Sequence, residues 1–552
     1  MRELYARYAR EKYNSQGVLC DYRLEYPDNF NFGYDIVDDI AVNEPERTAM
    51  VWCSDTGEEH IFSFAEMKRF SDKTANFLRA QGVKKGDKVM VVLKRHYEFW
   101  FTAVALHKLG AVLIPATFML QAHDVDYRIR AAEISCVVTC SDCGVPEAVD
   151  AVEAGCPSLR AKVLVGEKRP GWTDFTSGVA AAGETLERVE TNVLEPMILY
   201  FSSGTSGYPK MVLHDHTYAL AHLFTARHWH NVNPEGLHFT IADTGWGKAV
   251  WGKLYGQWMC EAAVFTYDFE KFNADEILKR MEKYRVTTFC CPPTMYRMLL
   301  KADLTKYDLS ALEYCTTAGE AMPPEAFRAW KEATGISIME GYGQTETTVA
   351  LCNLKGMTPK PGSMGKPSPQ YRVALMDADG DPCPAGTTGE IVISMKHGRP
   401  DGLLNCYYLD GEKTAEAMRG GWYHTGDTAW MDEDGYFWYV GRNDDIIKSS
   451  GYRIGPFEIE SVLLEHPAVL ECAVTGVPDA LRGQLVKATI VLREGYTGSD
   501  ALTEELQKFV KKRTAPYKYP RVIAYVESLP HTVNGKIRRV AIREADDKAA
   551  QS

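Results

Sequence analysis

The chain has 552 residues, of which 45% are hydrophobic and 25% are charged, and its formal net charge is −12 at neutral pH. This length exceeds what one hydrophobic core usually supports, so at least two domains are expected. The acidic balance disfavours nucleic acid or an anionic membrane as a partner, and any anionic substrate must therefore be bound by local positive groups.

The first ten residues are charged throughout and lack the apolar core of a signal peptide. The most apolar window, residues 99–120, is interrupted between His107 and Pro115, before it reaches the roughly twenty apolar residues of a membrane helix. It predicts a helix that ends near Gly110, followed by a strand. Because 14 cysteines in no regular framework indicate a reducing compartment, we expect a cytoplasmic protein without integral membrane association.

Four cysteines between residues 136 and 156 are candidate metal ligands, namely Cys136, Cys140, Cys143 and Cys156. Residues 136–140 have the pattern of a buried strand, however, and no second C-x-x-C pair completes a zinc spacing. The sequence therefore favours cysteines that pack as small apolar residues over a metal site.

From residue 61 onward, β-rich runs alternate with amphipathic helical stretches such as residues 275–283. This rhythm predicts parallel sheets covered by helices. The predicted strands lie at residues 88–93, 137–139, 162–165, 287–290 and 337–339.

Near Tyr371 the pattern changes to hairpins, with strands predicted at 372–376 and 389–394 and a small β-rich subdomain at about 360–441. Residues 377–381 are typical of a hairpin turn, because no glutamate closes a calcium-binding loop there. After Arg442 an α+β unit follows, with strands at 469–474 and 487–492 and a helix at 503–512. The tail after Arg543 is expected to be frayed.

Residues 200–210 combine hydroxyl side chains, two glycines and a lysine directly after an apolar strand. Gly204 and Gly207 permit backbone conformations that other residues rarely adopt, so N–H groups and hydroxyls can converge on phosphate oxygens. Lys210 adds a mobile positive charge. The spacing differs from a Walker A motif, in which the lysine directly follows the second glycine. The segment therefore predicts a phosphate-binding loop of another kind, with an ordinary flexible loop as the alternative.

Four further motifs follow in order, at residues 339–346, 423–427, 441–453 and 534–539. Together with the first loop, they make the chain resemble the acyl-adenylate-forming superfamily, which includes acyl-CoA synthetases, luciferases and the adenylation domains of peptide synthetases. The resemblance covers nearly the whole chain. Residues 242–249 and 515–521 are similar to the corresponding segments of the medium-chain acyl-CoA synthetases.

The resemblance implies an α/β fold with a large N-terminal domain of layered sheets, a small β-rich subdomain and a smaller, mobile α+β C-terminal domain. The expected boundaries are residues 1–441 and 442–552, with a hinge near Asp444. The C-terminal domain would carry the catalytic lysine, Lys536, and a loop that faces coenzyme A.

For ATP, the resemblance implies that Lys536 bridges the carboxylate and the α-phosphate and that Thr345 donates a hydrogen bond to the same phosphate. Glu346 and Thr205 would bind Mg²⁺, and Asp427 would accept both ribose hydroxyls. The predicted ATP-binding residues are Ser202, Ser203, Gly204, Thr205, Ser206, Gly207, Lys210, Gly319, Glu320, Glu340, Gly341, Tyr342, Gly343, Gln344, Thr345, Asp427, Arg442 and Lys536.

Coenzyme A is the implied co-substrate, and the acyl pocket is implied near Trp246, Lys248 and Gly343. Acetate-specific relatives carry tryptophan at the position of Gly343, so a longer or bulkier acid is expected here. The predicted coenzyme A contacts are Ser450, Gly451, Tyr452, Arg453, Arg482, Lys511, Tyr519, Pro520 and Arg521.

The sequence thus predicts an AMP-forming acyl-CoA synthetase, a monomer or homodimer that acts on a medium-chain, branched short-chain or aryl acid. Two alternatives are an adenylating enzyme that loads a carrier protein and a nucleotide-binding regulator without catalysis. His214, His216 and His424 are not expected to act as bases, because a carboxylate is already deprotonated at neutral pH. The surroundings of Lys536 resemble sites of lysine acetyltransferases in related synthetases, and acetylation would remove its charge.

Overall fold

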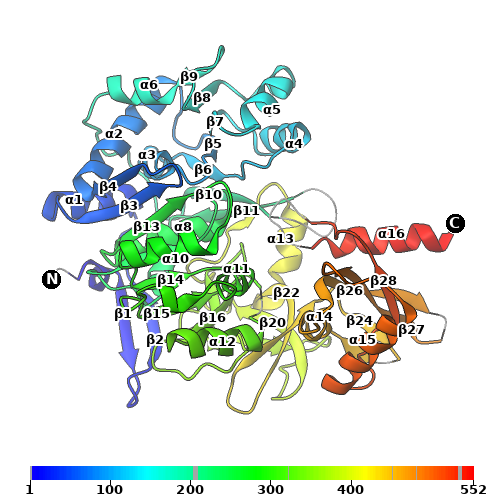
Figure 1. Cartoon of the computed structure of the whole chain (residues 1–552). Coiled ribbons are helices and arrows are strands. Elements are labelled where there is room, and N and C mark those ends of the chain that lie inside the picture. The colour runs from blue at the N-terminus through cyan, green and yellow to red at the C-terminus, as the bar shows by residue number, and fades with distance from the viewer. Residues whose placement is uncertain are drawn as a thin grey trace. The chain divides into compact units, whose positions relative to one another are not determined.

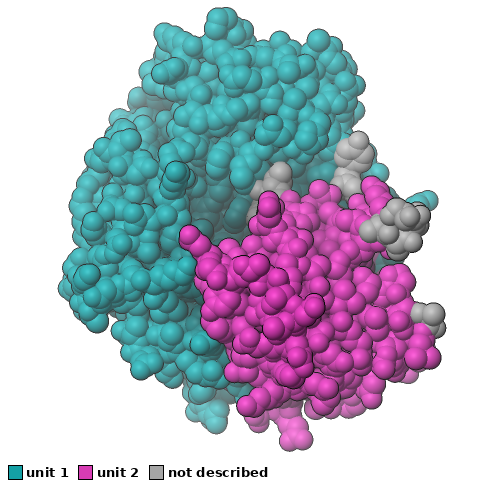
Figure 2. All heavy atoms as spheres, turned by 45° about the vertical axis from the view of Figure 1, so that its right-hand side comes forward, with its two compact units in different colours: residues 1–372, 395–416 teal, residues 373–394, 417–552 magenta. Residues whose placement is uncertain are grey.

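The computed structural model describes residues 3–202, 209–320, 322–450, 452–479, 481–531 and 537–551 (Figure 1). Its contacts divide the chain into two compact units, which Figure 2 shows in separate colours. The first unit comprises residues 1–372 and 395–416, and the second comprises residues 373–394 and 417–552.

An eight-stranded sheet forms one part of the first unit. Five neighbouring strands, β10, β6, β5, β7 and β8, are parallel to one another. At one edge β11 is antiparallel to β10, and β21 is antiparallel to β11. Figure 1 shows helices α2, α3 and α6 on one side of these strands and α4 and α5 on the other. In order across the sheet, the strands are β21 (Cys406–Tyr407), β11 (Lys210–Asp215), β10 (Pro196–Ser202), β6 (Val112–Pro115), β5 (Lys88–Val92), β7 (Cys136–Cys140), β8 (Ala161–Val165) and β9 (Thr173–Asp174).

A nine-stranded sheet forms another part of the first unit, and its central strands are also parallel. Helix α10 covers it as the sequence predicts: the side chain of Asn273 caps its first turn, and Ile277, Leu278 and Met281 are buried on one face. The strands are, in order, β18 (Lys366–Pro367), β17 (Val349–Cys352), β16 (Ile338–Gly343), β15 (Tyr314–Thr317), β14 (Thr288–Cys290), β12 (Leu237–Thr240), β13 (Ala263–Asp268), β3 (Thr48–Ser54) and β4 (Glu59–Ser63).

The second unit holds two smaller sheets. One is an antiparallel sheet of β19 (Val373–Met376), β20 (Thr388–Ser394), β22 (Trp422–Met431) and β23 (Phe437–Arg442), and it contains the hairpins predicted from the sequence. The other joins β25 (Tyr452–Ile454), β24 (Ile447–Ser449), β27 (Gly483–Leu492), β26 (Val469–Asp479) and β28 (Val522–Tyr525). The predicted fold class, layered α/β sheets followed by a β-rich sheet and an α+β part, is confirmed.

The remaining elements complete the described chain. A hairpin of β1 (Ala9–Tyr13) and β2 (Leu19–Leu24) lies at the N-terminus. The predicted helix that ends near Gly110 is α3, and Gly110 closes it with a positive φ of 66°. The helices are α1 (Asp39–Asn43), α2 (Phe64–Ala80), α3 (Glu98–Leu109), α4 (Ala122–Ala132), α5 (Val145–Val152), α6 (Phe175–Ala181), α7 (Thr217–Phe224), α8 (Gly247–Lys253), α9 (Tyr255–Met259), α10 (Ala274–Lys283), α11 (Pro293–Leu299), α12 (Pro324–Thr334), α13 (Gly411–Ala417), α14 (Pro456–Leu464), α15 (Asp500–Arg513) and α16 (Arg539–Gln551).

The expectation of a frayed tail after Arg543 is wrong, because residues 539–551 form helix α16. Its first turns are held inside the second unit: Arg539 forms an ion pair of 2.6 Å with Glu460, and Arg543 forms one of 2.5 Å with Asp445. The side chain of Ile542 is buried. These partners lie far away in the sequence, so the charged composition of the tail gave a false indication of disorder.

The grouping by contacts differs from the domain boundary expected from the sequence. Contacts place the four-stranded β19–β23 sheet in the second unit, whereas the sequence assigned everything up to residue 441 to the N-terminal domain. The boundary at residues 441 and 442, with a hinge near Asp444, stays a prediction. Among the described residues, none of the helices is both long and apolar enough to cross a membrane.

Candidate active site

The predicted phosphate-binding loop connects two antiparallel strands, β10 and β11. Ser202 ends β10 and Lys210 begins β11, and these two residues are partners in the register of the hairpin. The ammonium group of Lys210 lies 5.4 Å from the centre of the Tyr407 ring, within reach of a cation–π interaction. The predicted ligands Ser203, Gly204, Thr205, Ser206 and Gly207 lie outside the described residues.

Glu346, the predicted magnesium ligand, is buried just beyond β16. The hydroxyl group of Tyr407 donates a 2.9 Å hydrogen bond to its Oε1, and the N–H of Leu404 donates one of 2.8 Å to its carbonyl oxygen. Tyr407 therefore fixes the carboxylate through one oxygen. A carboxylate oxygen is the type of ligand that Mg²⁺ prefers, so the side chain present fits the predicted ion.

The backbone of Thr345 is held by His214 on β11. Nε2 of His214 lies 2.8 Å from the carbonyl oxygen of Thr345. Because a carbonyl oxygen can only accept, this nitrogen must carry the proton. Burial lowers the pKa of His214 to about 4, so the imidazole is neutral at physiological pH and acts as a positioning group.

The eight-stranded sheet brings these groups together. Strand β21 pairs with β11, and Tyr407 is the register partner of Val212, two residues after Lys210. One sheet edge thus links the strand after the predicted phosphate loop with the residue that holds Glu346. The sequence analysis missed Tyr407 and Leu404, since neither belongs to a motif. The only local signal was a short β-type run, Cys406–Tyr407, which gives no indication of its partner.

Residues 342–345 are partly or fully exposed, whereas Glu340 is buried in β16. The carboxyl group of Glu340 accepts a 3.2 Å hydrogen bond from the N–H of Met322, and burial raises its pKa to about 8. This carboxyl group therefore points into the protein interior and is protonated at neutral pH.

Two glycines of the same segment are required by close packing. A Cβ on Gly341 would lie 2.6 Å from the indole of Trp229, and one on Gly343 would lie 2.4 Å from the carbonyl oxygen of Thr348. Both distances are far below van der Waals contact. The packing supplies its own reason for glycine at position 343, and the role of Gly343 in an acyl pocket stays a prediction.

Lys248 lies beside the turn that carries Gly319 and Glu320, two of the predicted ATP-binding residues. The ammonium group of Lys248 donates a 2.7 Å hydrogen bond to the carbonyl oxygen of Ala318, next to Gly319, whose φ is +101°. Thr294 donates a hydrogen bond of 3.1 Å to Glu320. Lys248 therefore fixes the turn that carries Gly319 and Glu320.

Trp246 directly precedes helix α8, whose first turn carries Lys248, and it is partly exposed. Its Nε1 atom is buried and has no hydrogen-bond partner among the residues that the structure describes. The loop is shaped by Asp243, whose carboxylate accepts a 2.8 Å bond from the N–H of Gly245. A donor in this position suits a polar atom of a bound molecule, but the assignment of Trp246 to the acyl pocket stays a prediction.

In the second unit, Asp427 and Arg442 face each other across the β22–β23 hairpin as register partners. Nη1 of Arg442 lies 3.6 Å from Oδ1 of Asp427, and the hydroxyl group of Tyr439 donates a 3.2 Å hydrogen bond to the same oxygen. Asp444, the predicted hinge residue, lies 3.7 Å from Nε of Arg442. The pair expected to bind the ribose is therefore formed by the fold of this hairpin.

His424 also has a structural partner. Its Nδ1 atom lies 3.0 Å from Oε2 of Glu390, whose Oε1 accepts a 2.9 Å bond from the N–H of Gly426. The same glutamate therefore orders both the histidine and the turn before Asp427.

The predicted coenzyme A contacts fall into two groups within the second unit. In the first, Nη1 of Arg482 donates a 3.2 Å hydrogen bond to Oγ of Ser450, and the ring of Tyr452 stacks on Tyr517 at 4.0 Å. Tyr452 is half exposed. Gly451, Lys536 and the side chain of Arg453 lie outside the described residues.

The second group surrounds Tyr519. Arg521 donates a 2.7 Å hydrogen bond to its hydroxyl group, and the ammonium group of Lys511 lies 5.0 Å from its ring. Pro520, between Tyr519 and Arg521 in the sequence, is buried. Two cations are thus fixed beside one aromatic ring, which is an arrangement suited to phosphate groups.

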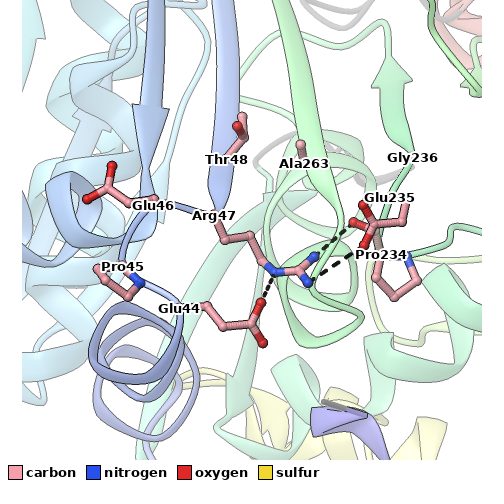
Figure 3. A pocket seen from close by; sticks show the side chains of 9 residues that line it. All are labelled: Glu44, Pro45, Glu46, Arg47, Thr48, Pro234, Glu235, Gly236 and Ala263. Carbon is pink, nitrogen blue, oxygen red and sulfur yellow. Dashed lines mark hydrogen bonds and ion pairs between the residues drawn. The ribbon is translucent and has the colours of Figure 1, made fainter. Parts of the chain in front are cut away.

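Two surface cavities contain none of the predicted site residues. The larger, about 450 Å³, surrounds Arg47, whose guanidinium group contacts Glu44 and the carbonyl oxygen of Pro234 (Figure 3). The other, about 420 Å³, lies around Lys85 and Tyr408. The guanidinium group of Arg47 is bound by acceptors of the protein itself, so the first cavity is lined by an ion-pair network.

Comparisons with known proteins agree with the geometry. Two family models match, "AMP-binding enzyme" over residues 37–408 and "AMP-binding enzyme C-terminal domain" over residues 458–536. The acyl-coenzyme A synthetase ACSM3, mitochondrial, of Homo sapiens is 42% identical over 545 residues, which cover 97% of this chain and 93% of the relative.

Solved structures are similar over almost the whole length. The anthranilate CoA ligase AuaEII, solved with anthranoyl-AMP, has a TM-score of 0.86 and 30% identity, with 96% of this chain and 99% of that chain covered. The benzoate CoA ligase of Burkholderia xenovorans LB400 has a TM-score of 0.79 and 27% identity, with 93% and 100% covered.

Proposed function

The chain belongs to the AMP-binding enzyme family, and on this premise we propose that it is an AMP-forming acyl-CoA synthetase. In the first half-reaction, a carboxylate attacks the α-phosphorus of ATP and gives an acyl-adenylate and diphosphate. In the second, the thiol of coenzyme A attacks the acyl carbon and gives acyl-CoA and AMP.

One observation in the first unit carries the proposal. Lys210 and Glu346, which come from two separate motifs, meet on opposite parts of the Tyr407 side chain. A cation for phosphate and a carboxylate for Mg²⁺ are the two groups that a bound MgATP requires. The contact is made by Tyr407, a residue outside the motifs, so the motifs alone did not imply that the two groups share a partner.

We propose the following roles for the chain's own groups. The side chain of Glu346 would hold Mg²⁺, which when bound neutralises charge on the phosphates. The hydroxyl group of Thr345 would donate a hydrogen bond to the α-phosphate, and His214 would keep the backbone of Thr345 in place. Lys210 would offset charge on the leaving diphosphate.

A further set of roles concerns the nucleotide sugar and the carboxylate. Asp427 would accept hydrogen bonds from the ribose hydroxyls, with its orientation set by Arg442 and Tyr439. Lys536 would bring the carboxylate and the α-phosphate together by its positive charge. No general base is needed, because the acid is ionised at neutral pH.

The substrate is proposed to be a medium-chain, branched short-chain or aryl carboxylic acid. Two similar structures are ligases of aryl acids, anthranilate and benzoate, whereas the human relative is named only for acyl groups. We also propose a cytoplasmic location and a monomer or homodimer. Fractionation of cells and light scattering of the purified protein test these two points.

The decisive experiment is an AMP-release assay with coenzyme A and acids from acetate to dodecanoate, together with benzoate and branched acids. The proposal predicts acid-dependent formation of AMP and diphosphate with at least one of them. Release that depends on a carrier protein in place of coenzyme A would indicate the alternative function. Absence of AMP formation with every acid would refute the proposal.

A variant separates the two half-reactions. Lys536→Ala should abolish carboxylate-dependent diphosphate exchange and leave thioester formation from supplied acyl-AMP intact. Lys548→Ala, which removes an exposed lysine of α16, is the matched control and should change neither reaction. Equal loss of both half-reactions in Lys536→Ala would contradict the assigned role.

A further inference from the structure

Four potential metal ligands meet at the carboxyl ends of two neighbouring parallel strands, β5 and β7. Cys140 is the last residue of β7, with Asp142 and Cys143 directly after it, and His96 lies just after β5. Val92 and Thr139 are register partners, so the two strand ends lie side by side. None of the four belongs to the predicted ATP, acyl or coenzyme A sites.

Three of these residues have ligand atoms close enough together to share one ion. The ligand atoms of His96, Cys140 and Asp142 all lie within 4.8 Å of one another. Nε2 of His96 is 3.4 Å from Oδ2 of Asp142, and Sγ of Cys140 is 3.6 Å from Sγ of Cys143. Bonds from zinc of about 2.3 Å to sulfur and about 2.1 Å to nitrogen or oxygen place two sulfurs about 3.8 Å apart and an N,O pair about 3.4 Å apart.

We propose that His96, Cys140, Asp142 and Cys143 form a binding site for one Zn²⁺ ion. Two thiolates, an imidazole and a carboxylate are ligand types that zinc accepts, and the C-x-x-C spacing is typical of zinc sites. Cys143, whose Sγ lies beside that of Cys140, is the proposed fourth ligand, and it stands outside the three residues whose ligand atoms are all mutually close. This proposal does not depend on the proposed function.

The surroundings of the cluster fit a bound cation. The ammonium group of Lys94 lies 2.7 Å from Oδ2 of Asp142 and also contacts Glu270. Two thiolates and the carboxylates of Asp142 and Glu270, together with a divalent ion and Lys94, leave one net negative charge. Cys140 is buried, whereas the side chains of His96 and Asp142 are 23% and 45% exposed, so an ion can enter from solvent.

A disulfide is the competing state of the two cysteines. The sulfurs are 3.6 Å apart, whereas a disulfide bond is about 2.05 Å long, and both cysteines are free thiols. Two thiols at this separation can share a metal ion without backbone movement. From the sequence, only the cysteines were weighed as metal ligands, together with a search for a second cysteine pair; His96 and Asp142 are the two proposed ligands outside that pattern.

The cluster is joined to the loop that carries Trp246. The carbonyl oxygen of Lys94 accepts a 3.0 Å hydrogen bond from the N–H of Thr244, and the side chain of Lys94 binds Asp142. An ion that fixes Asp142 would therefore also stabilise the position of Lys94 and of this loop. Binding to the folded state alone must raise the melting temperature.

The test uses the full-length protein, reduced and stripped of metal with a chelator, then loaded with Zn²⁺ or Co²⁺ and dialysed. We expect one zinc ion per chain by elemental analysis and a higher melting temperature with zinc. Bound Co²⁺ should show thiolate-to-cobalt charge-transfer absorption and the intense visible bands of tetrahedral cobalt. These signals report the ligands directly and do not rely on enzyme activity.

The variants His96→Ala and Cys143→Ser should each raise the Kd for zinc at least tenfold, because they remove a ligand. Cys156→Ser, which removes a buried thiol of the same region outside the cluster, is the control and should bind zinc like the wild type. If a ligand variant does not fold, as judged by circular dichroism, Asp142→Asn replaces it, since that side chain is partly exposed.

Three results would overturn the proposal. Substoichiometric zinc after dialysis would show that the cluster is an ion-pair network only. Equal zinc retention in wild type, His96→Ala and Cys143→Ser would place the ion elsewhere. Formation of a Cys140–Cys143 disulfide in air, with no zinc bound under reducing conditions, would identify a redox pair instead.

Discussion

Two buried carboxylates predicted to serve the nucleotide, Glu346 and Asp427, are held in different ways. The partners of Asp427 lie on its own hairpin: Arg442 is its register partner, and Tyr439 is 12 residues away. Glu346 is held by Tyr407, which is 61 residues away. The orientation of Asp427 therefore follows from local structure, whereas that of Glu346 depends on the correct packing of a distant strand.

This difference predicts which contacts the orientation of each carboxylate depends on. A hairpin positions Asp427 as soon as β22 and β23 pair, and Arg442 and Tyr439 support it redundantly. Glu346 has one side-chain donor, Tyr407, among the contacts described. We therefore expect the loss of one hydrogen-bond partner to disturb the function of Glu346 more than that of Asp427.

Glu346→Gln should have the largest effect. Loss of the negative charge removes the proposed magnesium ligand while the shape is kept, and kcat should fall about 10²–10³-fold. Acid-dependent diphosphate release at several Mg²⁺ concentrations measures it. Glu332→Gln, on the exposed face of α12, is the matched control. A loss below threefold would remove Glu346 from the site.

Asp427→Asn should follow. A hydrogen bond to a charged group contributes about 1.5–3 kcal/mol, so the KM for ATP should rise about 10- to 150-fold. The wild type should also discriminate against 2′-deoxy-ATP more strongly than the variant does. Unchanged discrimination would show that Asp427 does not bind the ribose.

Tyr407→Phe tests the comparison itself. It removes the hydrogen bond to Glu346 but keeps the ring beside Lys210. A loss of about 0.5–1.5 kcal/mol corresponds to a roughly 2- to 13-fold higher Mg²⁺ requirement. Tyr439→Phe should change the KM for ATP less, because Arg442 still contacts Asp427. Adding Tyr407→Phe to Glu346→Gln should cost nothing further. Equal effects of the two tyrosine variants would break the distinction.

Glu340→Gln should have the smallest effect on activity but a clear effect on pH dependence. The pKa of Glu340 is raised to about 8, so between pH 4.5 and 8 the unfolded state has lost a proton that the folded state keeps. Stability must then fall as the pH rises through this range. The amide keeps the acceptor for Met322, and the variant should lose less melting temperature between pH 5.5 and 8 than the wild type. An unchanged slope would contradict the raised pKa.

The sequence predicted those features that depend on neighbours along the chain. Alternating runs predicted β5, β7 and β8, the turn chemistry predicted the β19–β20 hairpin, and two separate motifs supplied Asp427 and Arg442. Helix α16 was missed because its stabilising partners, Glu460 and Asp445, are remote. The hydrogen bond from Tyr407 to Glu346 could not be predicted either, because these two residues are also remote in the sequence.

The crowding around the Gly-Tyr-Gly segment restricts genetic variation. Every base change in a glycine codon that alters the amino acid adds at least one carbon, and at Gly341 and Gly343 that carbon would overlap Trp229 or the backbone of Thr348. Gly343 is exposed, and exposed sites usually tolerate exchange. In a saturation library, substitutions at this exposed codon should therefore be depleted as strongly as substitutions at a core codon.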